Sequence, residues 1–344
     1  MKTVRLGRTG LMVSRVGMGG IPITRTPLED VPKVVGRALD LGVNLIDTAV
    51  GYSTSEERIG IGVAGRRDEV FLATKTPARD TRTARDHLEI SLKRFGTDHI
   101  DIWQFHGVSS EDWKKILGPG GAMEAAKEAL RAGKVGHIGA SSHNFEAAEM
   151  LIDSGAIETI QFPFNFVTPE AERLVKLAEE HDVGFIAMKP FAGRVLTDNV
   201  GLAIRYLLQF DNVIPIPGVE KAEEIEEIVG LAEAPKPITK AERKLMAEIK
   251  EGLGSRYCRQ CEYCLPCPQG VFIPGILYLK RLYELWPQER FFSWKYVSDS
   301  VASAEGCVKC GACEERCLFR LPIREMIDEN IEFYNGVAKG RAEQ

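Results

Sequence analysis

Eight cysteines are the residues of clearest chemical character, and all of them lie between residues 258 and 317. They form two runs of four with short spacing: Cys258, Cys261, Cys264 and Cys267, then Cys307, Cys310, Cys313 and Cys317. Eight thiols in two such runs are the inventory for two four-iron four-sulfur (4Fe-4S) clusters. Two zinc sites of four thiolates each are the alternative, but zinc sites usually pair two Cys-x-x-Cys knuckles rather than run three consecutively.

The spacing also predicts which thiols share a cluster. In bacterial two-cluster ferredoxins, the fourth cysteine of each run ligates the other cluster. That exchange groups Cys258, Cys261, Cys264 and Cys317 in one set, and Cys307, Cys310, Cys313 and Cys267 in the other. The chain departs from the ferredoxin pattern in having two residues before Cys267 instead of three, and Leu318 where a proline would follow Cys317.

Four polar residues form a second group with chemical potential. Asp47, Lys75 and His106 each end a short apolar segment, and Tyr52 follows the first of these segments in a loop. If the segments are parallel strands of one barrel, their carboxyl ends meet at the face where active sites lie. The alternative for Asp47 and Lys75 is a buried ion pair with a purely structural role.

The elements that must position these residues alternate along the chain. Apolar strands are predicted at residues 16–20, 43–48, 70–74, 100–105, 135–140, 159–162, 184–188 and 213–217, with helical patterns between them. Alternating strands and helices favour parallel βαβ units, and eight strands are the count for a closed (β/α)8 TIM barrel. An open doubly wound sheet is the alternative, although no G-x-G-x-x-G motif follows the first strand.

In these stretches the chain resembles the aldo-keto reductases. The resemblance rests on Asn44-Leu45-Ile46-Asp47-Thr48-Ala49 with Gly51-Tyr52, on Ala73-Thr74-Lys75 and on Asp101-x-x-x-Phe105-His106, and it covers about residues 1–230. It implies a catalytic tetrad of Asp47, Tyr52, Lys75 and His106, a small carbonyl or alcohol substrate, and hydride transfer with bound NADP or NAD. The expected cofactor contacts are Gly19, Gly20, Ser141, Ser142, Gln161, Met188, Lys189, Pro190, Gly218, Val219, Lys221 and Glu224.

The chemistry of these residue types agrees with the implied tetrad. A tyrosine, with an ordinary pKa of about 10, donates a proton poorly near neutrality unless its pKa is lowered. A lysine ammonium beside the phenol lowers that pKa, and an aspartate keeps the lysine charged. A histidine can orient the carbonyl oxygen by a hydrogen bond.

The segment after the eighth predicted strand departs from the family pattern. Family members often carry a lysine, a hydroxyl residue and an arginine there, which bind the adenosine 2′-phosphate. Here Gly218 and Val219 replace the first two, Glu224 stands near the arginine position, and only Lys221 could supply positive charge. NAD is therefore as credible a cofactor as NADP.

The cysteine segment carries a second resemblance. Cys258-x-x-Cys261-x-Tyr263-Cys264-x-Pro266-Cys267-Pro268 resembles the tail of the iron–sulfur branch of the aldo-keto reductases. The interpretation is a reductase barrel over residues 1–250 and a small α-helical, ferredoxin-like iron–sulfur domain over residues 251–344. Residues 273–286 are predicted to be helical.

Composition sets outer limits on the function. The chain has 344 residues, 44% hydrophobic and 27% charged, with a formal net charge of −5. That balance is ordinary for a globular protein and gives no case for nucleic acid or a membrane surface as partner. Clustered cysteines without an apolar leader indicate a reducing, cytoplasmic location.

The resulting hypothesis is an NAD(P)-dependent oxidoreductase whose clusters are either structural or relay electrons, with a ferredoxin or another redox protein as a candidate partner. Two alternatives remain: a non-catalytic nicotinamide or redox sensor, and an electron-transfer subunit built on a barrel scaffold. Substrate specificity is expected in the long loops at residues 107–121 and 189–199.

Overall fold

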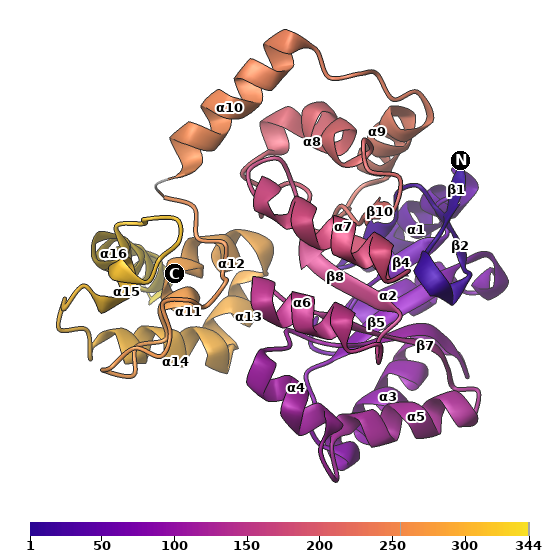
Figure 1. The fold of residues 1–344 in the computed structure, drawn as a ribbon, viewed down its shortest axis with the longest axis horizontal. Coiled ribbons are helices and arrows are strands. Elements are labelled where there is room, and N and C mark those ends of the chain that lie inside the picture. The colour runs from indigo at the N-terminus through magenta and orange to yellow at the C-terminus, as the bar shows by residue number, and fades with distance from the viewer. Residues whose placement is uncertain (255, 343–344) are drawn as a thin grey trace. The chain divides into compact units, whose positions relative to one another are not determined.

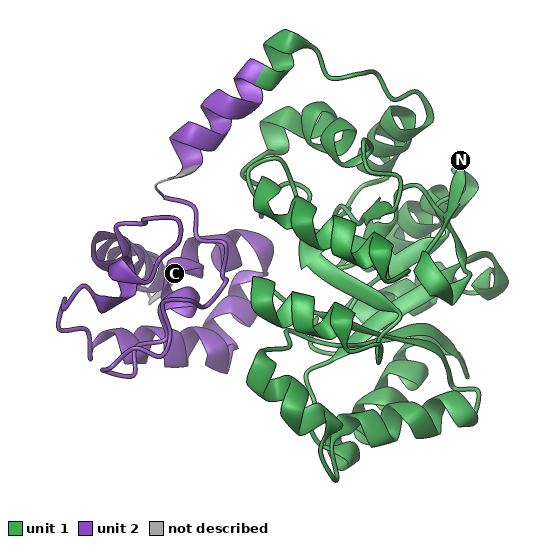
Figure 2. Ribbon diagram, in the orientation of Figure 1, with its two compact units in different colours: residues 1–243 green, residues 244–344 purple. Residues whose placement is uncertain are grey.

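The computed structural model describes residues 1–254 and 256–342. The chain divides into two compact units, Met1–Arg243 (unit 1) and Lys244–Gln344 (unit 2), which Figure 2 shows in different colours. The division falls within the helix α10 (Lys240–Gly254), and so does the domain boundary predicted at residue 250.

Unit 1 begins with an antiparallel hairpin and continues as a curled parallel sheet. The hairpin pairs β1 (Thr3–Arg5) with β2 (Met12–Ser14). The sheet has eight strands within unit 1, ordered β3 to β10 as in the sequence. They are β3 (Met18–Gly19), β4 (Leu45–Asp47), β5 (Phe71–Thr76), β6 (Ile100–Phe105), β7 (Val135–Ser141), β8 (Thr159–Pro163), β9 (Gly184–Met188) and β10 (Val213–Pro215).

The two outer strands of this sheet meet each other. Gly17 N donates to Pro215 O at 2.9 Å and Gly19 N donates to Pro217 O at 2.7 Å, and Gly19 and Gly218 form a parallel bridge. A side chain at Gly19 could not be accommodated, because its Cβ would lie 2.8 Å from Ile216 O. The arrangement is consistent with the predicted (β/α)8 barrel.

Helices surround the strands of unit 1 (Figure 1). They are α1 (Val31–Asp40), α2 (Ser55–Gly62), α3 (Thr81–Phe95), α4 (Ser110–Leu117), α5 (Ala122–Arg131), α6 (Phe145–Asp153), α7 (Glu172–Glu180), α8 (Val200–Leu207) and α9 (Ala222–Glu233). In α3, Asp80 caps the N-terminus by accepting from Thr83 N, and Gly96, with φ of 67°, ends the helix. Leu88, Leu92 and Phe95 form its buried face, as the helical period predicts.

One predicted loop was wrong. Residues 107–121 are not an extended loop, because α4 occupies Ser110–Leu117. Ser109 Oγ accepts from Asp112 N at 3.1 Å and Asp112 Oδ2 accepts from Ser109 N at 3.3 Å. This capping box and the buried Trp113 and Ile116 are the signals that the sequence reading missed.

Unit 2 is helical in its described part. Beyond α10 it contains α11 (Ile273–Leu277), α12 (Leu279–Leu285), α13 (Gln288–Ser293), α14 (Lys295–Ala304), α15 (Ala312–Glu315) and α16 (Ile323–Ala342). The helix predicted at residues 273–286 is thus two short helices. The unit has its own small core, formed by Val271, Ile273, Ile276, Leu277, Cys313, Leu321, Ile323, Met326 and Ile327. Five further cysteines pack against that core: Cys258, Cys264, Cys267, Cys307 and Cys317.

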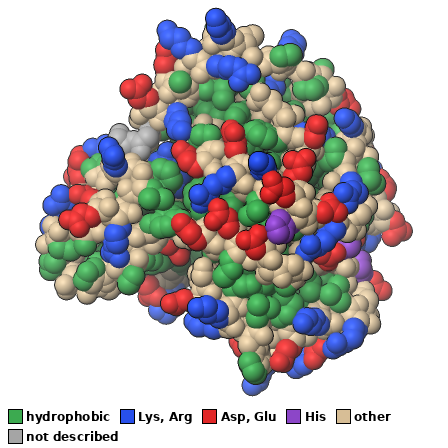
Figure 3. Space-filling view, in the orientation of Figure 1, with side chains coloured by type: hydrophobic (Ala, Val, Ile, Leu, Met, Phe, Trp, Pro, Cys, Tyr) green, Lys and Arg blue, Asp and Glu red, His purple; other side chains and the backbone are tan. Residues whose placement is uncertain are grey.

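The surface shows no strong segregation of charge on the face drawn in Figure 3, where acidic and basic side chains are interspersed. Among the residues that the structure describes, no helix combines the length and the apolar character needed to cross a membrane.

Candidate functional site

The four tetrad candidates lie at the carboxyl ends of neighbouring strands. Asp47 is the last residue of β4, Lys75 lies near the end of β5, His106 directly follows β6, and Tyr52 lies in the loop between β4 and α2. Asp47 and Lys75 are 3% and 1% exposed. Lys75 Nζ donates to Asp47 Oδ1 and to the carbonyl of Thr48, both at 2.6 Å.

Tyr52 lies beside both the ammonium and the imidazole. Its hydroxyl is 3.5 Å from His106 Nε2, and the two rings meet edge to face with centroids 5.5 Å apart. Lys75 Nζ lies 5.2 Å from the centroid of the Tyr52 ring. The structure therefore brings the four predicted residues together around one phenol.

The electrostatics of the site follow from burial. Burial lowers the pKa of Lys75, and the carboxylate of Asp47 acts in the opposite direction. Burial, with the positive charges of Lys75, Arg79 and Lys189, lowers the pKa of His106 to about 3. His106 is consequently a neutral imidazole at pH 7, able to orient an oxygen by a hydrogen bond without carrying charge.

Two glutamines complete the surroundings of Asp47. Gln104 Nε2 donates to its Oδ2 and Gln161 Nε2 donates to its Oδ1, each at 3.0 Å. The Oε1 atoms of both glutamines are buried and have no hydrogen-bond partner among the described residues. Gln161 was predicted as a cofactor contact, whereas Gln104 was missed; an amide within the apolar run of β6 was the available signal.

Several of the expected cofactor contacts make internal contacts. Ser141 Oγ accepts from Gly107 N at 2.9 Å, and Ser142 Oγ donates to Val108 O at 2.8 Å. A Cβ at Gly20 would lie 2.8 Å from Ser55 Oγ, so close packing already accounts for that glycine. The assignment of these three residues to a cofactor stays a prediction.

The residue that follows β9 has an unusual backbone conformation. Lys189 has φ of 54°, a conformation uncommon for a residue with a side chain, and its carbonyl accepts from Asn165 Nδ2 at 2.9 Å. Met188 O accepts from Phe164 N at 3.1 Å. Pro190, buried in the next position, was also an expected contact.

His143, which the sequence reading missed, lies in the loop after β7. Its Nε2 is buried and has no partner among the described residues. Burial, Lys189 and His106 lower its pKa well below the ordinary value. The signal for it was its place next to Ser142 after a barrel strand.

The segment after β10 holds the last expected contacts. Val219 is fully buried, and a Cβ at Gly218 would lie 2.6 Å from Pro22 Cγ. Glu224 Oε2 accepts from the backbone N–H groups of Glu220 and Lys221 at 2.8 and 3.1 Å. The Lys221 side chain is exposed.

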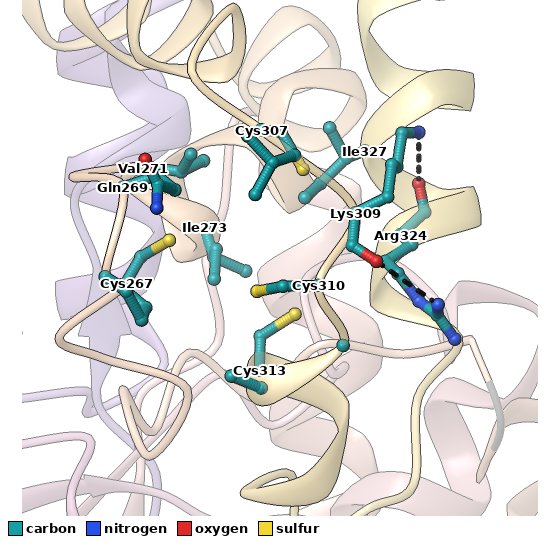
Figure 4. Close-up of a pocket in the computed structure, with 14 residues that line it drawn as sticks. Cys267, Gln269, Val271, Ile273, Cys307, Lys309, Cys310, Cys313, Arg324 and Ile327 are labelled. Carbon is teal, nitrogen blue, oxygen red and sulfur yellow. Dashed lines mark hydrogen bonds between the residues drawn. The ribbon is translucent and has the colours of Figure 1, made fainter.

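In unit 2, four cysteines line one small cavity of about 20 Å³: Cys267, Cys307, Cys310 and Cys313 (Figure 4). They are the four that the exchange pattern of two-cluster ferredoxins groups together. None of the eight cysteines forms a disulfide. No group of three or more His, Cys, Asp or Glu side chains in the described residues is placed to hold a single metal ion.

In the other set of four cysteines, neighbouring thiols affect one another's pKa. Burial raises the pKa of the Cys264 thiol to about 12, and Cys258 and Cys261 add to that rise. Burial likewise raises the pKa of Cys261, and Cys317 adds to it. Cys317, from the second run, thus lies near Cys261 of the first run.

The two cysteine runs share an unusual backbone path. Gln260 and Lys309 each precede the second cysteine of their run, and their φ angles are 60° and 58°. Glu262 and Gly311 each follow the second cysteine, with φ of 68° and 85°. Three of these four residues are not glycine, and such conformations persist where the surrounding structure or a function demands them.

Comparison with known proteins gives consistent matches. A sequence profile of the aldo/keto reductase family matches residues 15–201. Aldo-keto reductase YhdN of Bacillus subtilis (strain 168) is 34% identical over 195 residues, which are 51% of this chain and 57% of that protein. The oxidoreductase YqkF of the same organism is 29% identical over 212 residues, 58% of this chain and 67% of that protein.

Solved structures show the same fold. Aldo-keto reductase AKR11C1 from Bacillus halodurans superposes with a TM-score of 0.63 and 24% identity, covering 72% of this chain and 96% of that one. An aldo-keto reductase from Klebsiella pneumoniae, solved in complex with NADPH, superposes with a TM-score of 0.61 and 19% identity, covering 72% and 95%.

Proposed function

Because this chain belongs to the aldo/keto reductase family, we propose that it is an NAD(P)-dependent oxidoreductase that interconverts a small carbonyl compound and its alcohol. The observation that carries the proposal is the position of the Tyr52 hydroxyl, 3.5 Å from His106 Nε2 and beside the buried Lys75 ammonium. Such a phenol can give a proton to a carbonyl oxygen that His106 orients.

When bound, a nicotinamide cofactor would supply the hydride for the carbonyl carbon. Tyr52 donates its phenolic proton to the oxygen as the electrons of the C=O double bond move onto that oxygen. The resulting phenolate lies near Lys75, whose ammonium stabilises the negative charge until a proton from solvent restores the phenol. In the direction of oxidation, the same phenolate removes the proton of the alcohol.

The hydrogen bonds around Asp47 and Lys75 suit this role of the Lys75 ammonium. Removing a buried ammonium from water is costly unless it is paired and hydrogen-bonded. Lys75 has a carboxylate and a carbonyl as acceptors, and Gln104 and Gln161 orient that carboxylate from the other side. The ammonium is therefore held beside the phenol rather than drawn toward solvent.

The site also offers groups that would hold a nicotinamide. The buried Oε1 of Gln161 lacks a hydrogen-bond donor in the described structure, and a carboxamide N–H is a suitable one. Ser141 Oγ uses its acceptor capacity for Gly107 N, and its own O–H remains available to a carboxamide oxygen. These features support the cofactor contacts predicted at the end of β7 and β8.

The test is a Tyr52→Phe variant of the full chain, purified without oxygen. We expect kcat for carbonyl reduction to fall by at least about 100-fold, because general acid catalysis contributes about 100- to 10,000-fold. Tyr334→Phe removes a phenol hydroxyl in unit 2 and should leave kcat unchanged. Undiminished reduction by Tyr52→Phe would overturn the assignment of Tyr52 as proton donor, whereas no carbonyl reduction by the parent protein would favour a sensor or an electron-transfer subunit.

We also propose that unit 2 holds two 4Fe-4S clusters, one on each exchanged set of four cysteines. The grouping of Cys267 with Cys307, Cys310 and Cys313 around one cavity supports this. The equivalent backbone path of the two runs supports it too, because equal loops suit equal ligands. Four thiolates on one zinc ion would converge to about 2.3 Å from a single point, whereas a four-iron cluster spreads its thiolates over a larger body.

The clusters need not take part in hydride transfer. A cluster passes single electrons, whereas nicotinamide passes two as hydride, so a flavin or a redox partner such as a ferredoxin would have to connect them. Anaerobic analysis should give about eight irons and eight sulfides per chain if two 4Fe-4S clusters are bound. Zinc in place of iron would contradict the proposal, and EPR signals after NADH or NADPH alone would require a mediator within the protein.

A further inference from the structure

A buried carboxylate outside the tetrad lies in the first turn of α2. Glu56 is fully buried, and its two oxygens accept hydrogen bonds from three side chains. Thr74 Oγ1 and Ser91 Oγ donate to its Oε1 at 2.7 and 2.6 Å. Arg94 Nη1 donates to its Oε2 at 3.1 Å. A buried carboxylate is costly unless it is paired and hydrogen-bonded, and here both conditions are met.

Two of these donors connect Glu56 to the surroundings of the proposed catalytic residues. Thr74 directly precedes Lys75 in β5. Arg94 Nη1 also donates to the carbonyl of Val50 at 2.8 Å, and Val50 lies two residues before Tyr52. Val50 N in turn donates to Lys75 O at 3.1 Å. The start of the loop that carries Tyr52 is therefore fixed from two sides, by a guanidinium and by β5.

The helices α2 and α3 pack closely where this pair forms. A Cβ at Gly60, one turn after Glu56 in α2, would lie 2.7 Å from the carbonyl oxygens of Arg94 and Phe95. Glycine at this position allows the two helices to approach each other. The approach places Arg94 within reach of both Glu56 and the Tyr52 loop.

Charged and titratable groups from three elements face Glu56. Arg94 and His87 lie on α3, and Lys75 lies on β5. On α2 itself, Glu57 is exposed, and its Oε1 lies 3.7 Å from Arg94 Nε. Because Glu56 is removed from water, its charge acts on its neighbours more strongly than the charge of Glu57 does.

The negative charge of Glu56 also reaches the Lys75 ammonium. Burial lowers the pKa of Lys75, Asp47 opposes that effect most strongly, and Glu56 opposes it further. Of the other titratable groups beside Lys75, His106 is neutral at pH 7 and Tyr52 is the proposed proton donor. A negative charge at Glu56 therefore favours the protonated forms of both Lys75 and Tyr52.

We propose that Glu56 is a positioning residue of this site, which acts through Arg94 on the loop that carries Tyr52 and through its charge on the Lys75 ammonium. The inference rests on the proposed function, which makes Tyr52 the proton donor. A purely structural ion pair would stabilise the contact of α2 with α3 without affecting proton transfer. A positioning role instead changes kcat and its pH dependence while substrate binding is retained.

The first test is Glu56→Gln in the full chain, purified without oxygen, with benzaldehyde as substrate and NADH or NADPH in excess. The amide keeps the size of the side chain and an acceptor oxygen but removes the charge. We expect kcat to fall at least about tenfold and KM for benzaldehyde to change less than about threefold, because misplaced catalytic groups slow the reaction itself. The alkaline limb of kcat should move to lower pH, because Tyr52 and Lys75 then lose a proton more readily.

Two matched variants separate positioning from packing. Glu57→Gln makes the same charge change at the next residue of α2, where the side chain is exposed, and should leave kcat and its pH profile as in the parent. Ser91→Ala removes a donor to the buried carboxylate but keeps the charge of Glu56 and its bond to Arg94. We expect Ser91→Ala to lower the melting temperature while the alkaline limb stays in place.

A further variant guards against a Glu56→Gln protein that does not fold. Arg94→Lys, at a partly exposed position, keeps a cation but has a shorter side chain. We expect kcat to fall while the alkaline limb stays in place, because the charge of Glu56 is retained. Unchanged kcat in both variants, with folding judged by circular dichroism, contradicts the inference, and so does an alkaline limb that moves equally in Ser91→Ala. If the parent protein reduces no carbonyl with either dinucleotide, the proposed function is wrong and this inference falls with it.

Discussion

At the scale of single residues, the candidate active site depends on one buried cation. Lys75 is 1% exposed, and its ammonium is compensated by Asp47 and by the carbonyl of Thr48. These acceptors offset the free-energy cost of burying the Lys75 ammonium. Burial, together with the positive charges of Lys75, Arg79 and Lys189, keeps the neighbouring His106 neutral.

The pKa of His106 predicts an acid-dependent loss of stability. The unfolded chain binds a proton at this histidine below its ordinary pKa of about 6.5, whereas the folded protein does not until about pH 3. Between these two pH values the unfolded state therefore binds more protons than the folded state. The stabilisation that comes from the neutral His106 is fully present above pH 6.5 and is lost as the pH falls toward 3. His106 should account for up to about 2 kcal/mol of the stability lost between pH 7.5 and 5.

Urea unfolding of wild-type protein and of His106→Gln at both pH values measures this contribution. The variant should lose less stability on acidification than the wild type does. His181→Gln, at an exposed histidine, is the matched control and should follow the wild type. An identical pH dependence for wild type and His106→Gln would show that the imidazole is not held neutral.

At the scale of elements, α4 connects a capping box to the active site. Asp112, part of that box, also accepts from Arg79 Nη2 at 3.2 Å. Arg79 Nη2 in turn donates to His106 O at 2.9 Å and to Gly107 O at 3.1 Å. The cap of α4 therefore helps to fix the backbone that carries His106.

Ser109→Ala should destabilise unit 1 by about 1 kcal/mol, because it removes the side-chain acceptor at the N-terminus of α4. Thermal unfolding followed by circular dichroism measures the change. Ser110→Ala, one position into the helix, tests for an unspecific effect of losing a hydroxyl and should be nearly neutral. A Ser109→Ala protein as stable as the parent would mean that the capping box contributes little.

At the scale of the whole molecule, the two units differ in what stabilises them. Unit 1 has an extensive buried core across its strands and helices. The core cluster of unit 2 includes Cys313 and packs against five further cysteines, so this core is built around the proposed cluster ligands. If clusters are bound, their binding free energy is part of the folding free energy of unit 2.

Removing iron anaerobically with a chelator should therefore unfold unit 2 selectively. Calorimetry of the cluster-containing protein should show a transition that disappears or shifts to lower temperature after chelation, while the transition of unit 1 remains. Dinucleotide binding, measured by fluorescence, serves as the control for an intact barrel. Loss of both transitions together would show that the stability of the barrel depends on the clusters.

The sequence by itself determined the local helices and strands, and which candidate catalytic residues lie together. β6 and β9 have the predicted bounds, and the other strands of the parallel sheet differ by only a few residues, because hydrophobic period and turn residues are local signals. The tetrad candidates came together since the ends of parallel strands share one face. The wrong loop at residues 107–121 shows the limit, because a short helix with a modest apolar face resembles a loop.

Only the tertiary structure decided how distant residues share contacts. Gln161 lies 114 positions from Asp47 and hydrogen-bonds it, and Glu220 lies 195 positions from Arg25 and pairs with it. No local pattern encodes such pairs, because they depend on the register of the strands and the closure of the sheet. The same folding placed Cys267 beside the second cysteine run. The cysteine spacing predicted, by analogy with ferredoxins, that Cys267 groups with the second run. The path of the chain through unit 2 brings these residues close together.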